Sequence, residues 1–486
     1  MSMSEAVPGG GFRTWRAADT GAGGRSPIEA LLFWSLLLLV GLMPLPFGSN
    51  RAWSWSLAGT VVGLLLLLHA LWAAASRGRV LRVPAGRIAI PLLIAAPAIL
   101  WAAAQIVPLP PSLAPDLAAP VWSAAGAALG VELVPRISSD PAATVTSLMR
   151  LATDLGIFAL AVMLLRSRRR ARTALSWLAG AAALYALYGL VAFVATPDRL
   201  LWFPRWAYFG DLTATFVNRN SFATFAGLGL LANLTLLAQR LDEAADGASL
   251  RGRFAAMLGA APSIMLRPGL SVLLLASAIV LSHSRGGFLS AGVGTAALLG
   301  LLLLARRINM ATKLLLGLAA VAIVVVTVLV SGGRTLERLG ETQLEEERAR
   351  VYAVVLRGIA ERPWAGHGYG AFDLASRAYH DGSVLSDYER AHDDYLEAAF
   401  ELGIPAAACL VAAIAYVAIC CAAGARRRRR DMVYPALGAA AAALVACHAV
   451  VDFSLQIPAV AAWFATLLAL GYAQSWRSED GIAPAA

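Results

Sequence analysis

Stretches of about 20 apolar residues recur along this chain, and they limit its possible folds more than any other feature. A bilayer core about 30 Å thick is crossed by roughly 20 residues of α-helix. Of the 486 residues, 59% are hydrophobic and only 14% are charged, which is unlike a soluble globular domain. The sequence therefore predicts an all-α polytopic membrane protein. The twelve expected spans are 29–47, 53–75, 88–107, 149–165, 173–195, 218–238, 268–283, 286–305, 312–331, 398–422, 433–452 and 457–475.

Basic residues cluster in alternate loops and so predict the orientation of the chain. Arg and Lys are abundant in short cytoplasmic loops of membrane proteins. Here they gather in 76–87, 166–172, 240–267, 305–313 and 425–430, and the tails add more. We therefore predict that both termini are cytoplasmic. The net charge of +10 then reflects topology, and we expect membrane lipids and no nucleic acid as partners.

Two outward segments are longer than turns: the proline-rich 108–148 and the larger 332–397. In the second, apolar residues recur at steps of three and four and predict an amphipathic helix over 336–361. A second helix is expected from about Asp387 into the span at 398. The apolar positions are Leu344, Val351, Tyr352, Val355, Leu356 and Ile359. The predicted organisation is a disordered cytoplasmic tail (1–28), spans 1–9 (29–331), a helical outer loop domain (332–397), spans 10–12 (398–476) and a cytoplasmic tail (477–486).

Polar and charged side chains gather at the outer ends of these spans. An ionisable group at a membrane span is costly and marks a candidate functional site. With the predicted topology, five separate segments bring such groups to one side of the membrane. Only His69 lies on the inner half of a span, where a packed core histidine is the simpler interpretation. The outer groups are Arg219, His283, Arg285, His367, His380, His392, His448 and Asp452.

Each candidate also has a purely structural interpretation. Gly286 and Gly287 would let a ligand approach closely beside Arg285, and a simple turn residue is the alternative interpretation. The "SHS" at 282–284 argues little for a serine hydrolase, because no strand–turn–helix surrounds it. The sequence is also compatible with lipid headgroup contact for Arg219, a helix cap for His392 with Asp393 and Asp394, and an i,i+4 pair of His448 with Asp452.

The residue types in this outer group suit transfer from a lipid-linked diphosphate. Arginines bind phosphates through charge-assisted hydrogen bonds. A histidine suits a general base that removes a proton from an acceptor hydroxyl. No CxxC or HExxH spacing occurs, so we expect no metal site and no cofactor. The four cysteines, Cys409, Cys420, Cys421 and Cys447, fall within spans 10 and 11 and are interpreted as packing residues.

Several motifs in order resemble the O-antigen ligase and polymerase family of bacterial envelope glycosyltransferases. The resemblance extends over roughly 107–460. It is carried by "VPLPPSLAP" (107–115), "ISSDPAATVTSLMRLA" (137–152), "ATFVNRNSFATF" (214–225), "LSHSRGGFLS" (281–290), "RARVYAVVLRGIAERPWAGHGYGAF" (348–372), "RAHDDYLEAAFELGIP" (390–405) and "HAVVDFSLQIPA" (448–459).

The resemblance implies a twelve-helix fold of the broad lipid-linked glycosyltransferase (GT-C-like) type, in the bacterial inner membrane with its site on the periplasmic face. It implies His392 and Arg285 as catalytic residues. In this chain Asp393 replaces the family's usual Asn after the histidine, and Ala406 replaces a usual Gly. The acid at 393 is expected to raise the pKa of His392 or to change the choice of acceptor. The residues expected to bind diphosphate or glycan are Arg219, Asn220, Gly286, Asp394 and Asp452.

The expected function is an inverting, metal-independent transfer of a glycan from undecaprenyl diphosphate to lipid A core or a similar acceptor. A polymerase that uses a lipid-linked repeat unit or polysaccharide as acceptor is the main alternative. A protein O-glycan transferase, a transporter and a non-catalytic member of the family are also compatible with the sequence. A transporter would place its charges near the bilayer midplane, whereas here they lie at one face.

Overall fold

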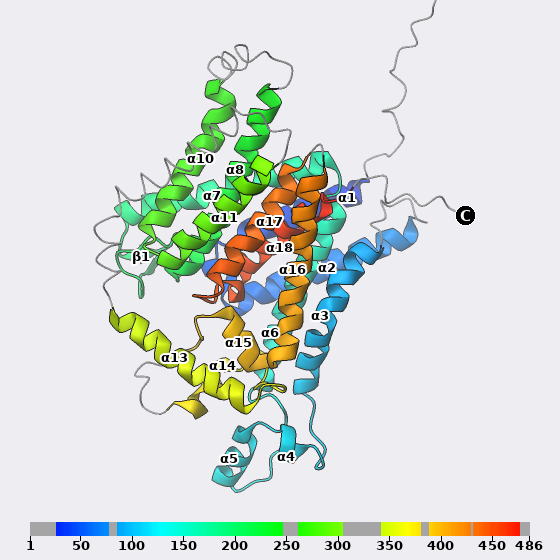
Figure 1. Ribbon diagram of the computed structural model, residues 1–486, viewed down its shortest axis with the longest axis vertical. Helices are drawn as coiled ribbons and strands as arrows, with labels where there is room; N and C mark the ends of the chain where they lie inside the picture. Colours follow the sequence, from blue (N-terminus) through cyan, green and yellow to red (C-terminus); the bar gives the residue numbers. More distant parts are fainter. Residues whose placement is uncertain are drawn as a thin grey trace, which may run out of the picture.

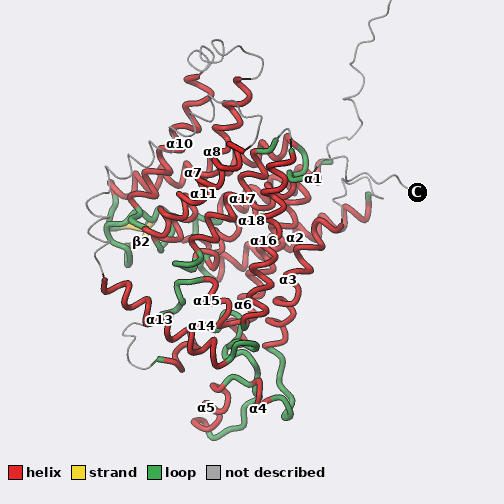
Figure 2. The backbone as a smooth tube through the Cα atoms, viewed as in Figure 1, coloured by secondary structure: helices red, strands yellow, loops and turns green. Residues whose placement is uncertain are grey.

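The computed structural model describes residues 26–76, 85–245, 261–304, 342–380, 388–428 and 431–476. Within these ranges the chain is almost entirely helical (Figure 2). The strands there are the two-residue β1 (Arg199–Leu200) and β2 (Phe203–Pro204), which pair antiparallel. The expected span at 312–331, the segment 332–341 and nearly all of both predicted tails lie outside the described residues.

Apolar helices form the bundle, and they lie at the positions of eleven of the twelve expected spans. Among the described residues, seven helices are long and apolar enough to cross a membrane, and four further apolar helices have 10–17 residues. The chain is thus an all-α polytopic membrane protein. The helices are α1 (Pro27–Leu42), α2 (Ala52–Ala75), α3 (Ala85–Gln105), α6 (Pro141–Leu164), α7 (Arg168–Ala195), α8 (Arg219–Ala245), α10 (Ala261–Leu281), α11 (Arg285–Leu304), α16 (Ile404–Arg427), α17 (Val433–His448) and α18 (Pro458–Ala473).

Helix α8 lies at the centre of the bundle. Its apolar window is 94% buried, and it packs against α7, α10, α11 and α17. Helix α2, in contrast, exposes Leu57, Leu64, Leu67 and Leu71. Lipid tails are as apolar as leucine, so a membrane-spanning helix can leave such a face uncovered by protein. The uneven burial therefore separates a protein-packed centre from a lipid-facing periphery.

Small residues bring α17 and α18 close together beside α8. A Cβ atom built on Gly471 would lie 2.7 Å from the Cα of Gly438, so the two backbones meet where neither residue has a side chain. Small residues at helix contacts are the usual means of close packing in membranes. This contact fixes the connection 449–457 between the two helices, which carries part of the site.

Four short helical elements form a layer at one end of the bundle, the same end as α4 (Ala114–Leu117) and α5 (Pro120–Leu129) (Figure 1). The layer consists of α13 (Thr342–Glu361), α14 (Phe372–Ser376), η2 (Arg377–Tyr379) and α15 (Asp394–Leu402). Val351, Val355 and Ile359 of α13 lie in its apolar core as the periodicity predicts. Leu356 does not, because it is 53% exposed.

Helices α15 and α16 are separate. The sequence predicts one helix that begins near Asp387 and continues into the span at 398–422, and this prediction is wrong. Helix α15 begins at Asp394 and ends at Leu402, and α16 begins at Ile404. Between them Gly403 has φ 78°, and a Cβ atom there would lie 2.4 Å from the carbonyl oxygen of Trp364. Only glycine adopts this conformation in so tight a space, so the break is a property of the sequence.

The expected outward segment 108–148 is shorter than predicted. Helix α6 begins at Pro141, eight residues before the span expected at 149–165. Asp140 caps it, since its carboxylate accepts hydrogen bonds from the backbone N–H groups of Ala142 and Ala143. A helix that starts with Asp–Pro follows the usual capping preferences.

Gln105, at the end of α3, attaches the outer layer to the bundle. It is fully buried, and its Nε2 donates to the carbonyl oxygens of Ala365 and Glu401, both at 2.9 Å. Its Oε1 accepts from the backbone N–H of Tyr369 at 2.9 Å. Both the nitrogen and the oxygen of this buried amide are therefore hydrogen-bonded, which favours a single arrangement of the groups around it.

His367 is buried inside the layer as a neutral side chain. Its ring stacks on Phe400 with centroids 4.3 Å apart, and its Nε2 lies 3.1 Å from the carbonyl oxygen of Gly358. Burial lowers the pKa of His367 to about 4, although the Gly358 carbonyl opposes this shift. The unfolded layer therefore binds a proton on His367 at a higher pH than the folded layer does, and folding becomes less favourable as the pH falls from about 6.5 to about 4.

We predict that the substitution His367→Gln weakens this pH dependence. The histidine contributes up to about 3 kcal/mol between pH 7 and pH 4. Hydrogen exchange of α13 and α15 amides, compared between wild type and variant over this range, measures the difference. Burial raises the pKa of Asp394 and Glu401, but both carboxyl groups are present in wild type and variant and cancel in the comparison. The control His380→Gln should keep the wild-type slope; an unchanged slope in His367→Gln would contradict the prediction.

Candidate functional site

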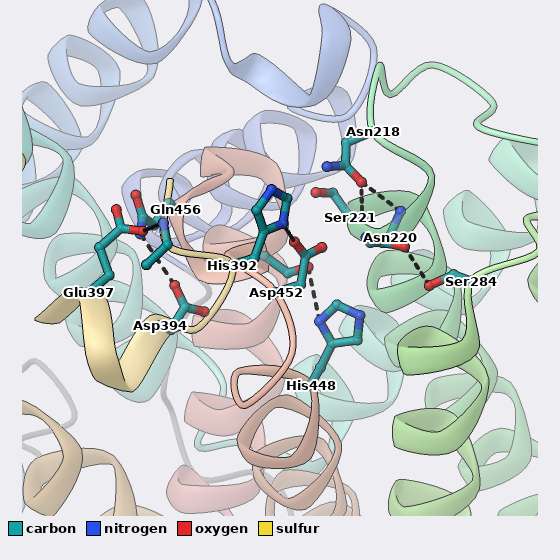
Figure 3. Close-up of polar contacts among 12 residues, drawn as sticks. Asn218, Asn220, Ser221, Ser284, His392, Asp394, Glu397, His448, Asp452 and Gln456 are labelled. Carbon is teal, nitrogen blue, oxygen red and sulfur yellow. Dashed lines mark hydrogen bonds and ion pairs between the residues drawn. The ribbon is translucent and has the colours of Figure 1, made fainter. Parts of the chain in front are cut away.

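The predicted site residues meet where four segments end at one side of the bundle (Figure 3). These segments are the start of α8, the start of α11, residues 388–394 before α15, and the connection 449–457 between α17 and α18. They are far apart in sequence, and the helix packing described above brings them together.

His392 and Asp452 form the central contact of the site. The Nδ1 atom of His392 lies 3.0 Å from Oδ1 of Asp452 (Figure 3). The Asp452 side chain is 1% exposed, whereas that of His392 is 21% exposed. An ionised Asp452 only accepts hydrogen bonds, so Nδ1 carries the proton and Nε2 is the atom left for a substrate. The Oδ2 atom of Asp452 is buried and has no hydrogen-bond partner among the described residues.

The backbone of His392 is held from two sides. The residue has φ 56°, a left-handed conformation that is uncommon for a side-chain-bearing residue. The hydroxyl of Tyr352 on α13 donates to the carbonyl oxygen of His392 at 3.1 Å, and the ring of Phe453 meets the imidazole edge-on at 4.9 Å. These contacts keep the unusual conformation and so fix the direction of the imidazole.

Asp393 caps α15, and the carboxylate bonded to His392 is that of Asp452. The Oδ1 atom of Asp393 accepts from the backbone N–H groups of Tyr395 and Leu396, both at 2.9 Å. Burial raises the pKa of Asp393, and the two N–H groups oppose that shift. The replacement of the family's usual Asn at this position therefore preserves a capping residue, since Asn and Asp are both favoured there.

Asp394 lies beside the same connection: its backbone N–H donates to the carbonyl oxygen of Ala449 at 2.8 Å, whereas its carboxylate makes long contacts. Its carboxylate accepts from the backbone N–H of Leu455 at 3.4 Å and from Nε2 of Gln456 at 3.5 Å (Figure 3). Burial raises its pKa well above the usual value, and the charges of Glu397 and Asp452 add to this. Protonated Asp394 would be able to donate a hydrogen bond as well as accept one.

Glu397 binds the segment that leads to His392. It is fully buried and accepts from Nη1 of Arg390 at 3.0 Å and from the backbone N–H of Ala391 at 2.8 Å. Glu397 lies within the motif at 390–405, but its sequence surroundings are those of an ordinary surface helix. Its burial follows from α15 packing onto the bundle, which the sequence pattern did not reveal.

His448 and Asp452 do not pair through their side chains. The Nδ1 atom of His448 lies 3.2 Å from the Ser454 hydroxyl, which in turn lies 3.0 Å from the Thr224 hydroxyl. The i,i+4 contact is a backbone one, since the N–H of Asp452 donates to the carbonyl of His448 at 3.1 Å. The Nε2 atom of His448 is buried without a hydrogen-bond partner in the described part of the chain.

Arg285 is the first residue of α11, so the outer turn is confined to 282–284. Ser284 caps the helix by accepting from the N–H of Gly287 at 3.0 Å, and it donates to Oδ1 of Asn220 at 2.8 Å (Figure 3). A Cβ atom on Gly286 would lie 2.7 Å from a methyl group of Val451. The space beside Gly286 is thus filled by protein, and the absence of a side chain there serves helix packing.

Asp211 is a site residue that the sequence analysis missed. Its Oδ2 accepts from Nη1 of Arg219 at 2.7 Å, and its Oδ1 lies 2.8 Å from Nδ1 of His283. Asp211 is 3% exposed. The only signal in the sequence is an acid in an otherwise uncharged run, "FGDLTATF" (209–216), close before Arg219.

Tyr208 lies near both His–Asp contacts. Burial raises its pKa, as do the charges of Asp452 and Asp211, whereas Arg219 and Arg348 oppose the shift. The guanidinium of Arg219 also lies 5.7 Å from its ring centre. Arg348, one helical turn before Tyr352 on α13, is thus a further cation near the site, and the sequence analysis did not select it.

The arrangement combines a candidate histidine base with cationic side chains in the same region. A base with one nitrogen bonded to a carboxylate is suited to take a proton from a hydroxyl. Arginines at helix starts are suited to bind an anion. Among the residues that the structure describes, no group of three or more His, Cys, Asp or Glu side chains is arranged to hold a metal ion.

Comparison with known proteins gives a family match over part of the chain. No curated protein matches the chain. Residues 270–411 match the family model described as O-antigen ligase, a range that contains Arg285 and His392. Arg219, Asp211 and Asp452 lie outside that range but contact or adjoin it in the fold. The apolar helices show a multi-pass membrane protein, and residues 270–411 are similar to the O-antigen ligase family, which supports membership of that family.

Proposed function

We propose that this protein transfers a glycan from undecaprenyl diphosphate to a hydroxyl of lipid A core, at the periplasmic face of the bacterial inner membrane. The contact between His392 and Asp452 is the observation that carries the proposal. This contact gives His392 a defined tautomer in which Nε2 can act as a base. The match to the O-antigen ligase model supports a lipid-linked glycan as the class of donor. The basic loops expected inside support a periplasmic position for this end of the bundle.

The reaction is a single displacement. His392 Nε2 removes the proton of the acceptor hydroxyl as its oxygen attacks the anomeric carbon. The bond from that carbon to the diphosphate oxygen breaks, and undecaprenyl diphosphate leaves as an anion. Attack from the side opposite the leaving group inverts the anomeric carbon.

The donor's diphosphate would lie against Arg219 and Arg285. Both arginines are partly exposed at helix starts, on the side of the site opposite His392. Charge-assisted hydrogen bonds to phosphate strengthen as negative charge grows on the leaving group. Asp452 acts through His392 as a positioning residue. Asn220 and Asp394 line the same region and are proposed to contact diphosphate or glycan, whereas Gly286 acts through helix packing.

We predict that His392→Ala abolishes transfer and that Asp452→Asn reduces kcat by about 10²–10⁴-fold. The amide would favour the tautomer in which Nε2 carries the proton and cannot act as base. Transfer from purified lipid-linked donor to lipid A core, with protein in nanodiscs, measures the rate. The control Asp373→Asn removes an exposed carboxylate paired with Arg377 and should leave the rate unchanged. Normal transfer by His392→Ala would refute the assignment of the base.

We predict that Arg285→Ala and Arg219→Ala weaken donor binding and lower kcat/KM by at least about 10-fold each. A charge-assisted hydrogen bond to a desolvated phosphate is worth roughly 1.5–3 kcal/mol, and more when the charge grows in the transition state. The same transfer assay with varied donor concentration tests this. Arg377→Ala, an exposed arginine outside the site, is the matched control. A wild-type kcat/KM in both site variants would refute the proposal that the diphosphate binds at this position.

Ligase and polymerase activities differ in the acceptor, and a deletion strain separates them. Loss of the ligase should leave free lipid A core together with accumulated polymer on the carrier lipid. Loss of a polymerase should instead leave lipid A core that carries a single repeat unit. Gel profiles of lipopolysaccharide and of the extracted carrier lipid measure both, and a profile unchanged by deletion would contradict either activity. Complementation by the wild-type chain, and not by His392→Ala, is the control.

A further inference from the structure

A second His–Asp pair lies on the arginine side of the site, and neither the motifs nor the family match assigns it a role. Asp211 joins Arg219 and His283 at 2.7 and 2.8 Å. These residues come from three places: the loop before α8, the first position of α8, and the turn between α10 and α11. One carboxylate therefore fixes two potentially cationic groups relative to each other.

Asp211 is itself rigidly placed. Its carbonyl oxygen accepts from Nη1 of Arg205 at 3.2 Å, and the next N–H, that of Leu212, donates to the carbonyl of Leu281 at 2.9 Å. The second bond ties the loop before α8 directly to the last residue of α10. The carboxylate is buried, so it depends on both partners to satisfy its charge.

His283 presents only one nitrogen to a ligand. Its Nδ1 is taken by Asp211, and its Nε2 makes no hydrogen bond within the described residues. The residue has φ 51°, so the turn holds it in a left-handed conformation two residues before Arg285. A non-glycine residue held in this way at the mouth of a site is a common mark of function.

Both His–Asp pairs lie near one tyrosine. The charges of Asp211 and Asp452 both raise the pKa of Tyr208, and the guanidinium of Arg219 lies 5.7 Å from the centre of its ring. His283, which pairs with Asp211, therefore lies in the same region as His392, with Arg219 on the same carboxylate.

We propose that Asp211 is a positioning residue that holds Arg219 and His283 as one anion-binding unit, and that His283 Nε2 is a third ligand for the donor's diphosphate beside Arg219 and Arg285. This inference rests on the proposed function. In its protonated form His283 donates Nδ1–H to Asp211 and Nε2–H to a phosphate oxygen. The proton enters from bulk water with the donor and stays on the imidazole, so the leaving group departs as the anion described above.

The substitutions His283→Gln and Asp211→Asn test the proposal. Both should raise the donor KM by roughly 10- to 100-fold, because each removes or misdirects a charge-assisted hydrogen bond. The kcat at saturating donor should change much less than in His392→Ala. Binding of undecaprenyl diphosphate to protein in nanodiscs, measured without acceptor, should weaken by the same factor. Asp211→Glu, which keeps the charge, should recover part of the loss.

Asp373→Asn is the matched control, since Asp373 also pairs with an arginine but is 53% exposed. If Asp211→Asn does not fold, His283→Gln alone carries the test, because it leaves the Asp211–Arg219 pair intact. Wild-type donor KM and undecaprenyl diphosphate binding in His283→Gln would overturn the proposal. That result, combined with loss of transfer in His392→Ala, would leave the proposed function standing. Normal transfer by His392→Ala would instead refute the proposed function first.

Discussion

Burial of Asp452 at the junction of α17, α18 and the segment before α15 is the constraint on which the arrangement of the site depends. An isolated buried carboxylate is costly, so it must be paired. Its bond to His392 joins the outer layer of short helices to the membrane bundle, and Glu397 reinforces that junction by holding Arg390 and Ala391. Because the bond occupies Nδ1, the same interaction that satisfies the buried charge also prepares Nε2 for a substrate. Structural and chemical requirements therefore coincide at one contact.

The bundle confines this polar cluster to one end. Inside it, α8 is surrounded by protein, and the buried amide of Asn233 donates to the carbonyls of Ala179 and Gly229. Helix starts, in contrast, leave N–H groups without helical partners, which serine, asparagine and aspartate can cap. Asn218 and Ser284 do this at α8 and α11. Arg219 and Arg285 thus stand at capped helix starts, where an anion is favoured.

The sequence predicted the apolar spans well, because about 20 apolar residues have few alternatives to a membrane helix. Its motifs also selected His392 and Arg285 as candidate catalytic residues, and the structure brings the segments that carry them together. It did not predict which carboxylate meets His392, since Asp452 is 60 residues away and the adjacent Asp393 was the more obvious candidate. Gly403 was missed as a helix break, because only the close approach of Trp364 makes glycine necessary there. Asp211 was missed because nothing local distinguishes it from a loop acid. A single sequence contains no pattern that shows which side chains, far apart along the chain, meet in the fold.

The two His–Asp pairs differ in a way that suits them to different tasks. Asp452 meets one histidine through Oδ1, and no other described group bonds to its Oδ2, so its charge acts mainly on His392. A carboxylate with one partner stabilises the imidazolium that forms when a base takes a proton. Asp211 divides its charge between His283 and Arg219, so the cluster has more cationic than anionic members once His283 is protonated. An excess of positive charge suits a group that binds an anion and would hinder a base. This difference between the two buried carboxylates supports the roles proposed above, in which the histidine beside Asp452 removes the proton and the histidine beside Asp211 contacts the diphosphate.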